Sequence, residues 1–221
     1  MTDAPTDDGA GSPAPSSAEL THGVGPWQGE LPAGDWWDEE LLRDGDRRNV
    51  VDKYRYWCHD AIVADLDKTR HSLHIAVENW QHDLNIGSVV RTGNAFNVGA
   101  VHIVGRRRWN RRGAMVTDKY QHIFHHPTVE DLLAWAEDHR LTVLGIDNFP
   151  DSVPLETYSF PKDCVLLFGQ EGPGLSEAAH QGCQAVLSID QFGSTRSINA
   201  SAAAAIAMHG WVRQHVFGQT P

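Results

Sequence analysis

The chain has 221 residues, 41% of them hydrophobic, and a net charge of −11. This length allows one domain with a sizeable core plus a tail. Residues 1–45 hold ten acidic residues and one basic residue, so the rest, with 19 acids and 17 bases, is nearly neutral and can carry a basic patch for nucleic acid. The three cysteines lie far apart and lack metal-ligand spacing, so we expect neither disulfides nor a bound metal. Without an evident signal peptide or membrane-spanning stretch, the protein is expected in the cytoplasm.

The N-terminal part is predicted to hold little structure. Residues 1–45 should form an acidic, largely disordered tail, because most of it is rich in Gly, Pro, Ser, Ala and Asp. The exception is a short helix over Trp36–Arg43, capped by Asp35. An N-terminal helical extension at residues 46–70 follows, in which apolar residues at helical spacing predict an amphipathic helix over Asn49–Asp67.

From residue 71 to residue 218, short apolar strands alternate with helices. This order predicts an α/β domain with a mostly parallel sheet that is covered on both faces. The predicted strands are His74–Val77, Val101–Val104, Thr142–Ile146, Val165–Phe168 and Ala185–Ile189. The predicted helices are Ile86–Phe96, Val129–Arg140, Leu175–Gln181 and Ser197–Val216.

Two of the predicted strands lead into polar segments suited to a ligand. After the first strand, Asn85 suits the N-cap of a helix, and Arg91 falls beside the apolar face of that helix. After the strand that ends at Phe168, a Gly-rich turn runs from Gly169 to Leu175. Its glycine order matches neither the dinucleotide nor the phosphate-loop pattern. Glu171 in the turn would repel phosphates, so the segment favours a neutral or cationic ligand.

A third polar segment leads into an alanine-rich helix. Ser197 and Asn199 stand where this helix begins, and its first amides can hold polar ligand groups. Residues 200–208 carry no charge, which predicts a helix buried on all sides. Because ligands bind at the carboxyl ends of parallel strands, we expect the three segments to meet.

In this order and spacing, the segments resemble the three signature motifs of the SpoU-type 2′-O-ribose RNA methyltransferases, a family of the SPOUT superfamily. The first motif has Asn, then Arg-Thr six residues on, as in Asn85 and Arg91-Thr92. The second is an apolar strand followed by G-x-E-G-x-G-L, matched from Gly169. The third, I-P-M-x-G-x-x-x-S-L-N-V-S, is matched from Ile189 to Ser201, with Asp190-Gln191 in place of Pro-Met. The resemblance covers residues 73–214.

The resemblance implies a C-terminal trefoil knot, an exception to the rule against threaded chains, and a homodimer with active sites near the interface. It also implies S-adenosylmethionine as cofactor and RNA as the partner that is methylated. Backbone around three residues would hold the cofactor: Gly169, Ile189 and Ile198. The catalytic region would comprise Arg91, Asn85, Glu171, Ser197 and Asn199. We expect Arg91 to clamp a phosphate and stabilise the oxyanion, because a guanidinium keeps its proton and is a poor base.

A basic segment follows the predicted strand Val101–Val104, independently of the family motifs. It consists of Arg106, Arg107, Arg108, Trp109, Asn110, Arg111 and Arg112. The arginines suit contacts with phosphates, and Trp109 suits stacking on an exposed base. A solvated charged loop is the alternative, but such a concentration of bases in an acidic chain favours RNA.

The target is less defined than the reaction. Transfer RNA is slightly favoured over ribosomal RNA, because Tyr158-Ser159-Phe160-Pro161 is similar to members that act on transfer RNA. An acidic tail also stands where ribosomal-type members carry an accessory domain. A non-catalytic RNA-binding or ribosome assembly factor that retained the fold remains an alternative, although the intact site residues argue against it. The glycine order disfavours a Rossmann-type dehydrogenase.

Overall fold

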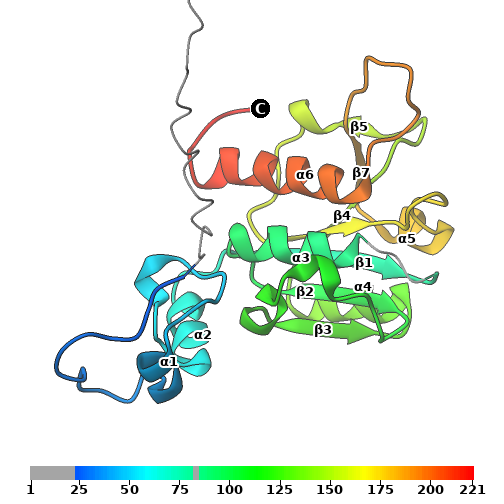
Figure 1. Cartoon of the computed structure of the whole chain (residues 1–221). Coiled ribbons are helices and arrows are strands. Elements are labelled where there is room, and N and C mark those ends of the chain that lie inside the picture. The colour runs from blue at the N-terminus through cyan, green and yellow to red at the C-terminus, as the bar shows by residue number, and fades with distance from the viewer. Residues whose placement is uncertain (1–22, 82–84) are drawn as a thin grey trace, which may run out of the picture. The chain divides into compact units, whose positions relative to one another are not determined.

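The structure, a computed structural model, describes residues 23–81 and 85–221 (Figure 1). The chain divides into two compact units, residues 1–57 and residues 58–221, and each is described by itself. The predicted disorder of residues 1–22 concerns a segment outside the described residues.

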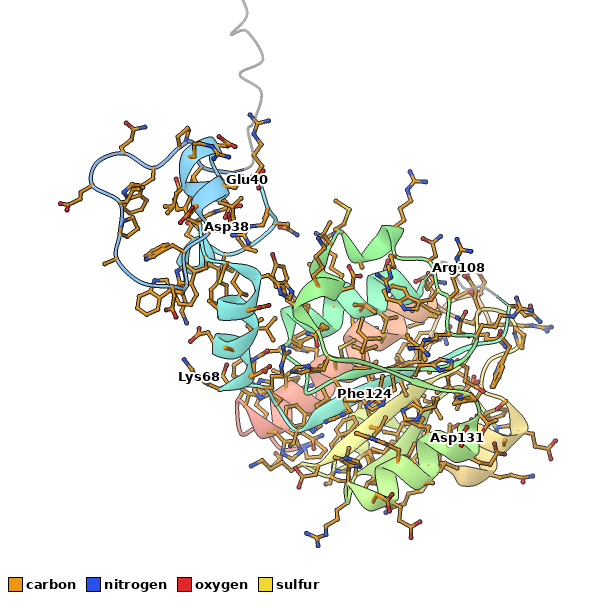
Figure 2. The ribbon with its side chains drawn as sticks, turned by 90° about the horizontal axis from the view of Figure 1, so that it is seen from below. Asp38, Glu40, Lys68, Arg108, Phe124 and Asp131 are labelled. Atoms are coloured by element: carbon orange, nitrogen blue, oxygen red, sulfur yellow. The ribbon has the colours of Figure 1, made fainter. Side chains whose placement is uncertain are left out.

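The described part of the first unit, residues 23–57, contains more structure than its composition suggests. Helix α1 (Glu39–Asp44) begins at Asp38, whose carboxylate accepts hydrogen bonds from the Glu40 and Leu41 amides at 3.0 Å (Figure 2). The predicted helix therefore starts three residues late, because Asp38 and not Asp35 caps it. Four tryptophans and two tyrosines contact one another in pairs: Trp27, Trp36, Trp37, Tyr54, Tyr56 and Trp57.

A buried ion pair organises this unit. The Asp46 carboxylate is fully buried, accepts hydrogen bonds from the Arg48 side chain at 2.8 and 3.0 Å, and accepts another from the Tyr56 amide at 3.0 Å. Burial alone would raise the pKa of Asp46, but these hydrogen bonds and the Arg48 charge lower it to about 2. The expectation of a largely disordered tail through residue 45 is thus not met for residues 23–45.

The predicted helix over Asn49–Asp67 is broken. Its first part forms only a 3₁₀ turn, η1 (Asp52–Tyr54), and its second part is α2 (His59–Asp67), which belongs to the second unit. Between them Tyr56 has a φ of +64°, a left-handed conformation that no continuous α-helix contains.

The second unit contains a seven-stranded sheet in the order β3-β2-β1-β6-β4-β7-β5, in which every neighbouring pair is parallel. The predicted α/β fold with a parallel sheet is confirmed. The strands are β1 (Leu73–Asn79), β2 (Val101–Gly105), β3 (Ile123–His126), β4 (Thr142–Ile146), β5 (Val153–Pro154), β6 (Cys164–Phe168) and β7 (Ala185–Ser188). The sequence analysis missed β3 and β5.

Helices cover both faces of this sheet (Figure 1). On one face, α3 (Ile86–Ala95) and α6 (Ala200–His215) pack on a core that includes Ile75 and Leu166. On the other face lie α4 (Val129–Asp138) and α5 (Glu177–Gly182). Three short 3₁₀ helices connect the strands: η2 (Arg112–Ala114), η3 (Thr117–Tyr120) and η4 (Leu155–Thr157).

The alanine-rich helix is buried on one side only. Ala204, Met208 and Trp211 lie in the core, whereas Ala202, Ile206, His209 and Arg213 form an exposed stripe in this single chain. The prediction of a helix buried on all sides was therefore wrong for the single chain, with Ile206 42% exposed. No helix among the described residues is long and apolar enough to cross a membrane.

Candidate functional site

A cavity of about 280 Å³ lies at the carboxyl ends of β6, β4 and β7, beside the start of α6. This is the edge at which open parallel sheets bind ligands. Its lining comprises Ile146, Asp147, Asn148, Phe168, Gly169, Gln170, Glu171, Gly172, Gly174, Ile189, Gln191, Ser197, Ile198, Asn199, Ala200 and Ala203. The structure thus brings together Gly169, Ile189 and Ile198, which the sequence analysis placed around a cofactor.

The loop after β6 needs glycine where it folds back on itself. The amide and carbonyl groups of Gln170 and Gly174 exchange two hydrogen bonds, at 3.1 and 3.0 Å. A Cβ atom on Gly169 would lie 2.0 Å from the carbonyl carbon of Gly174, a distance that no side chain can occupy. Gly174 has a φ of +76°, a left-handed conformation that favours glycine. The loop is therefore a fixed wall of the cavity.

Three side chains that the sequence analysis missed hold this loop in place. Asp147, which follows β4, accepts hydrogen bonds from the Leu175 amide and from the Asn148 amide, both at 2.7 Å. Gln170 accepts one from the Trp80 amide at 3.0 Å, and the buried Glu78 accepts one from the Ser176 amide at 2.8 Å. The position of Asp147 directly after an apolar strand was the signal that could have identified it.

A chain of hydrogen bonds joins the three predicted motifs at the rim of the cavity. The Asn85 amide nitrogen donates to the Glu171 carboxylate at 2.5 Å, and the Asn199 amide nitrogen donates to the Asn85 side-chain oxygen at 2.9 Å. The Asn199 oxygen in turn accepts hydrogen bonds from the backbone amide and hydroxyl of Ser201 and so caps α6. Asn85 occupies the N-cap position of α3, but its side chain makes no capping bond, because it is engaged in this chain.

Two other predicted catalytic residues lie differently. Ser197 lines the cavity, whereas Arg91 lies on the exposed side of α3 and is not part of the lining. Arg91 stands six positions after Asn85, a net rotation of roughly 240° about the helix axis, so the two side chains leave the helix in different directions. The structure therefore does not bring Arg91 into the cavity of its own chain.

The charged residues in the lining of the cavity are acidic. Its lining holds the carboxylates of Asp147 and Glu171, and no Lys, Arg or His is found among the lining residues that the structure describes. Apolar surface comes from Phe168, Ile189 and Ile198. The cavity therefore suits a ligand with an apolar body and a positive charge, where the sequence analysis expected a neutral or cationic ligand.

The arginine loop, residues 106–112, is held in place by a buried side chain of β1. The buried Asn79 donates hydrogen bonds to the carbonyl oxygens of Arg106 and Arg108 at 2.7 and 3.1 Å. Arg106, Arg107, Arg108, Arg111 and Arg112 are exposed, and Arg108 stands out at this edge of the unit (Figure 2). The predicted stacking role of Trp109 was wrong, because its ring is only 7% exposed and belongs to the core. Trp109 anchors the loop instead.

No group of three or more potential metal ligands occurs within residues 23–81 and 85–221. Cys164 and Cys183 form no disulfide, and burial raises the pKa of both to about 12. These thiols are therefore packing groups.

Several known proteins are similar to this chain. An "uncharacterized tRNA/rRNA methyltransferase" of Mycobacterium ulcerans (strain Agy99) is 30% identical over 171 residues, which cover 74% of this chain. The chain spans about half the length (54%) of that relative. A second relative with the same description, from Mycobacterium sp. (strain KMS), is 32% identical over 150 residues, which are 65% of this chain and 47% of the relative.

Solved structures are also similar to this chain. The SpoU methyltransferase AviRb from Streptomyces viridochromogenes superposes with a TM-score of 0.61 at 25% identity, over 72% of this chain and 65% of AviRb. The A. aeolicus TrmH/SpoU tRNA modifying enzyme has a TM-score of 0.64 at 20% identity and covers 72% of this chain and 83% of that enzyme, which supports the fold alone. The sequence profile of the SpoU rRNA methylase family matches residues 72–209, and the chain therefore belongs to this family.

Proposed function

We propose that the protein is an S-adenosylmethionine-dependent RNA 2′-O-ribose methyltransferase. The observation that carries the proposal is the hydrogen-bonded chain Glu171–Asn85–Asn199, which joins three distant segments at the rim of one cavity. Family membership supports methyl transfer, and the AviRb neighbour has also been solved in complex with the cofactor AdoMet.

The lining residues fit this cofactor. The loop packs on itself too closely at Gly169 to admit a Cβ atom, which fixes that wall of the cavity, and Phe168, Ile189 and Ile198 offer apolar surface to a nucleoside. Asp147 and Glu171 favour the positive charge of a sulfonium group. The bound cofactor would supply the methyl group.

The catalytic contribution of the chain's own residues is to position the ribose. A ribose hydroxyl is a weak nucleophile, and correct alignment can supply several kcal/mol, up to about 7–11 kcal/mol in well-oriented systems. Glu171, Asn85 and Asn199 lock one another in place, so their remaining polar atoms are fixed before RNA arrives. Ser197, which lines the cavity next to Asn199, adds a hydroxyl that can bind the same ribose.

Arg91 would act from outside the cavity. Its guanidinium is exposed and makes no hydrogen bond or ion pair with the residues that the structure describes, so it is available to a phosphate or to a developing oxyanion. Arg91→Ala should abolish methylation and leave S-adenosylmethionine binding unchanged, as measured by calorimetry. Loss of cofactor binding in this variant would rule out the assigned role.

RNA would contact the arginine loop. A hollow on the surface is lined by Arg107, Arg108 and Arg111 together with Asn110 and the edge of Trp109. The adjoining η2 packs on α3, the helix that carries Arg91, so phosphate contacts can continue from the loop towards the cavity. Transfer RNA is proposed ahead of ribosomal RNA. The similarity of the Tyr158–Pro161 segment to members that act on transfer RNA supports that choice, and in the structure the segment packs on α6 through bonds to Gln214 and Trp211.

The chain is also proposed to be a homodimer with a trefoil knot. The exposed stripe of α6 begins at Ala202 and Ile206, directly after the cavity, and a second copy would cover this apolar surface. The hydrogen bonds between α6 and residues 158–162, which precede β6, are consistent with threading of the C-terminal helix past that segment.

One experiment tests the central proposal, namely mapping 2′-O-methyl sites in total RNA from cells with and without the protein. The expected result is the loss of a specific site in transfer RNA when the protein is absent. A non-catalytic RNA-binding factor is the second candidate, favoured by the position of Arg91 outside the cavity. It predicts an unchanged methylation map and no binding of S-adenosylmethionine by calorimetry.

A further inference from the structure

We propose that the side-chain carbonyl of Gln191 recognises the cofactor by accepting a hydrogen bond from one of the cofactor's N–H or O–H groups. The inference rests on the proposed function, since it takes S-adenosylmethionine as the ligand of the cavity. It makes Gln191 a specificity-determining residue of this chain.

The starting point is a buried oxygen without a partner. Gln191 Oε1 is shielded from solvent, yet it receives no hydrogen bond from any residue within 23–81 and 85–221. Gln191 lines the cavity and follows Ile189, one of the residues assigned to the cofactor. The next residue, Phe192, is 95% exposed, so the chain turns outward immediately after Gln191.

Several other polar groups of the lining are already engaged. The two Asp147 oxygens accept the Leu175 and Asn148 amides, and Gln170 Oε1 accepts the Trp80 amide. The Asn199 oxygen accepts from Ser201. Gln191 Oε1 differs from these because none of the described residues donates to it, which suits an acceptor that is completed by a ligand.

An unsatisfied buried acceptor lowers the folding equilibrium constant by a factor of roughly 5 to 150. A ligand that donates a hydrogen bond to this oxygen gains the same factor in affinity, because binding removes the cost that the unsatisfied oxygen imposes on the free protein. The family motif described above has Met at this position, and a thioether is only a weak acceptor. The Gln191 carbonyl is therefore a feature of this chain beyond the shared motif.

The test is a substitution that should raise the stability of the free protein and lower its affinity for the cofactor. Gln191→Met removes the unsatisfied oxygen at similar volume, so the free protein should become more stable to urea. The same variant should bind S-adenosylmethionine about tenfold more weakly by calorimetry. Gln191→Glu, which keeps an acceptor, should retain most of the affinity. Phe192→Ala is the matched control, because its exposed ring lies outside the cavity, and it should change neither quantity.

The cofactor's donor group is identified with three ligands, namely S-adenosylmethionine, S-adenosylhomocysteine and adenosine. If adenosine binding weakens equally in Gln191→Met, the donor lies on the nucleoside, and if only the two amino-acid-bearing ligands weaken, it lies on the ammonium group. Unchanged affinity in Gln191→Met, or lower stability of the free variant, would overturn the proposal. Failure of the wild-type protein to bind S-adenosylmethionine would instead contradict the proposed function.

Discussion

The two halves of the sheet carry different loops at the same edge. Strands β6, β4 and β7 end at a cavity whose charged lining residues are acidic, whereas β2, on the other side of β1, ends in a loop with five exposed arginines. The interiors differ as well. All five residues of β6 are buried and uncharged, from Cys164 to Phe168. In the other half, His102 lies buried between His74 and His126, with ring nitrogens 3.0 and 2.8 Å apart.

On the proposed function, this arrangement separates two recognition tasks: the cavity at the ends of β6, β4 and β7 (the cavity half) would bind the cofactor, and the arginine loop after β2 (the RNA half) would bind RNA. A cationic cofactor needs an enclosed cavity with negative charge, and RNA needs an open surface with positive charge. Placing both at carboxyl strand ends keeps them near each other, while β1 lies between them. Because Asn79 holds the arginine loop whereas Glu78 and Asp147 hold the loop after β6, each half should respond to its own substitutions.

The largest effect is expected in the cavity half. Gly169→Ala places a methyl group 2.0 Å from the Gly174 backbone, so the loop must move. We expect cofactor affinity to fall by more than about 100-fold, well over the 1.4 kcal/mol that corresponds to tenfold. Calorimetry with S-adenosylmethionine measures this. Gly172→Ala has open space at the corresponding atom but a φ of +95°, and it should show a smaller loss from backbone strain alone. Equal losses in both variants would contradict the steric explanation.

The corresponding substitution in the RNA half is Trp109→Ala. Removal of a buried tryptophan should cost about 3–5 kcal/mol of unfolding free energy, measured by urea denaturation. Trp109→Phe, which keeps most of the apolar contact, should lose much less. If Trp109→Ala weakens RNA binding without lowering stability, the ring contacts RNA directly and its anchoring role is wrong.

The histidines predict an acid sensitivity that belongs to the RNA half. Burial lowers the pKa of His74 to about 4 and, together with the neighbouring histidines, that of His102 to about 2, from an ordinary 6.5. The folded-state pKa values of His74 and His102 lie below the unfolded-state value, so the contribution of these histidines to stability is fully present above pH 6.5. It is lost as the pH falls from 6.5 towards 4. The loss should reach a few kcal/mol, at about 1.4 kcal/mol per pKa unit.

Urea denaturation at pH 7 and pH 5 measures this acid sensitivity. His102→Gln should flatten the dependence, while His209→Gln, at an exposed position on α6, should leave it unchanged. A pH dependence that is identical in wild type and His102→Gln would show that other groups cause it.

The smallest effect on stability, and the one specific to RNA, is expected at the arginine loop. Exchange of Arg106, Arg107 and Arg108 for Ala should leave unfolding within about 0.5 kcal/mol, because these side chains are exposed. It should weaken binding to unfractionated transfer RNA and reduce the slope of log K against log salt by about 2–3. The exposed Arg43 of the first unit provides the control variant, Arg43→Ala. An unchanged slope would show that the arginine loop does not contact RNA.

The sequence predicted the cavity half better than the RNA half. Asn85, Glu171 and Asn199 could be placed together because each follows a parallel strand, and such strands end at one edge. The burial of Trp109 depends on long-range packing that its charged neighbours conceal. Strand β3 escaped notice because two of its four residues are histidines, and β5 because it has two residues. In the first unit, contacts between tryptophans ten or more residues apart, such as Trp27 and Trp37, leave no periodic pattern.

The chain of hydrogen bonds through Asn85 has a direction. Ser201 donates to Asn199, Asn199 to Asn85, and Asn85 to Glu171, so every proton points towards the one carboxylate at the end. Reversal of either asparagine amide would break the bonds on both of its sides at once, which makes the arrangement all-or-none. The side-chain amide protons of Asn85 and Asn199 should consequently give distinct NMR signals that appear and disappear together. These signals would report whether the three motifs are assembled.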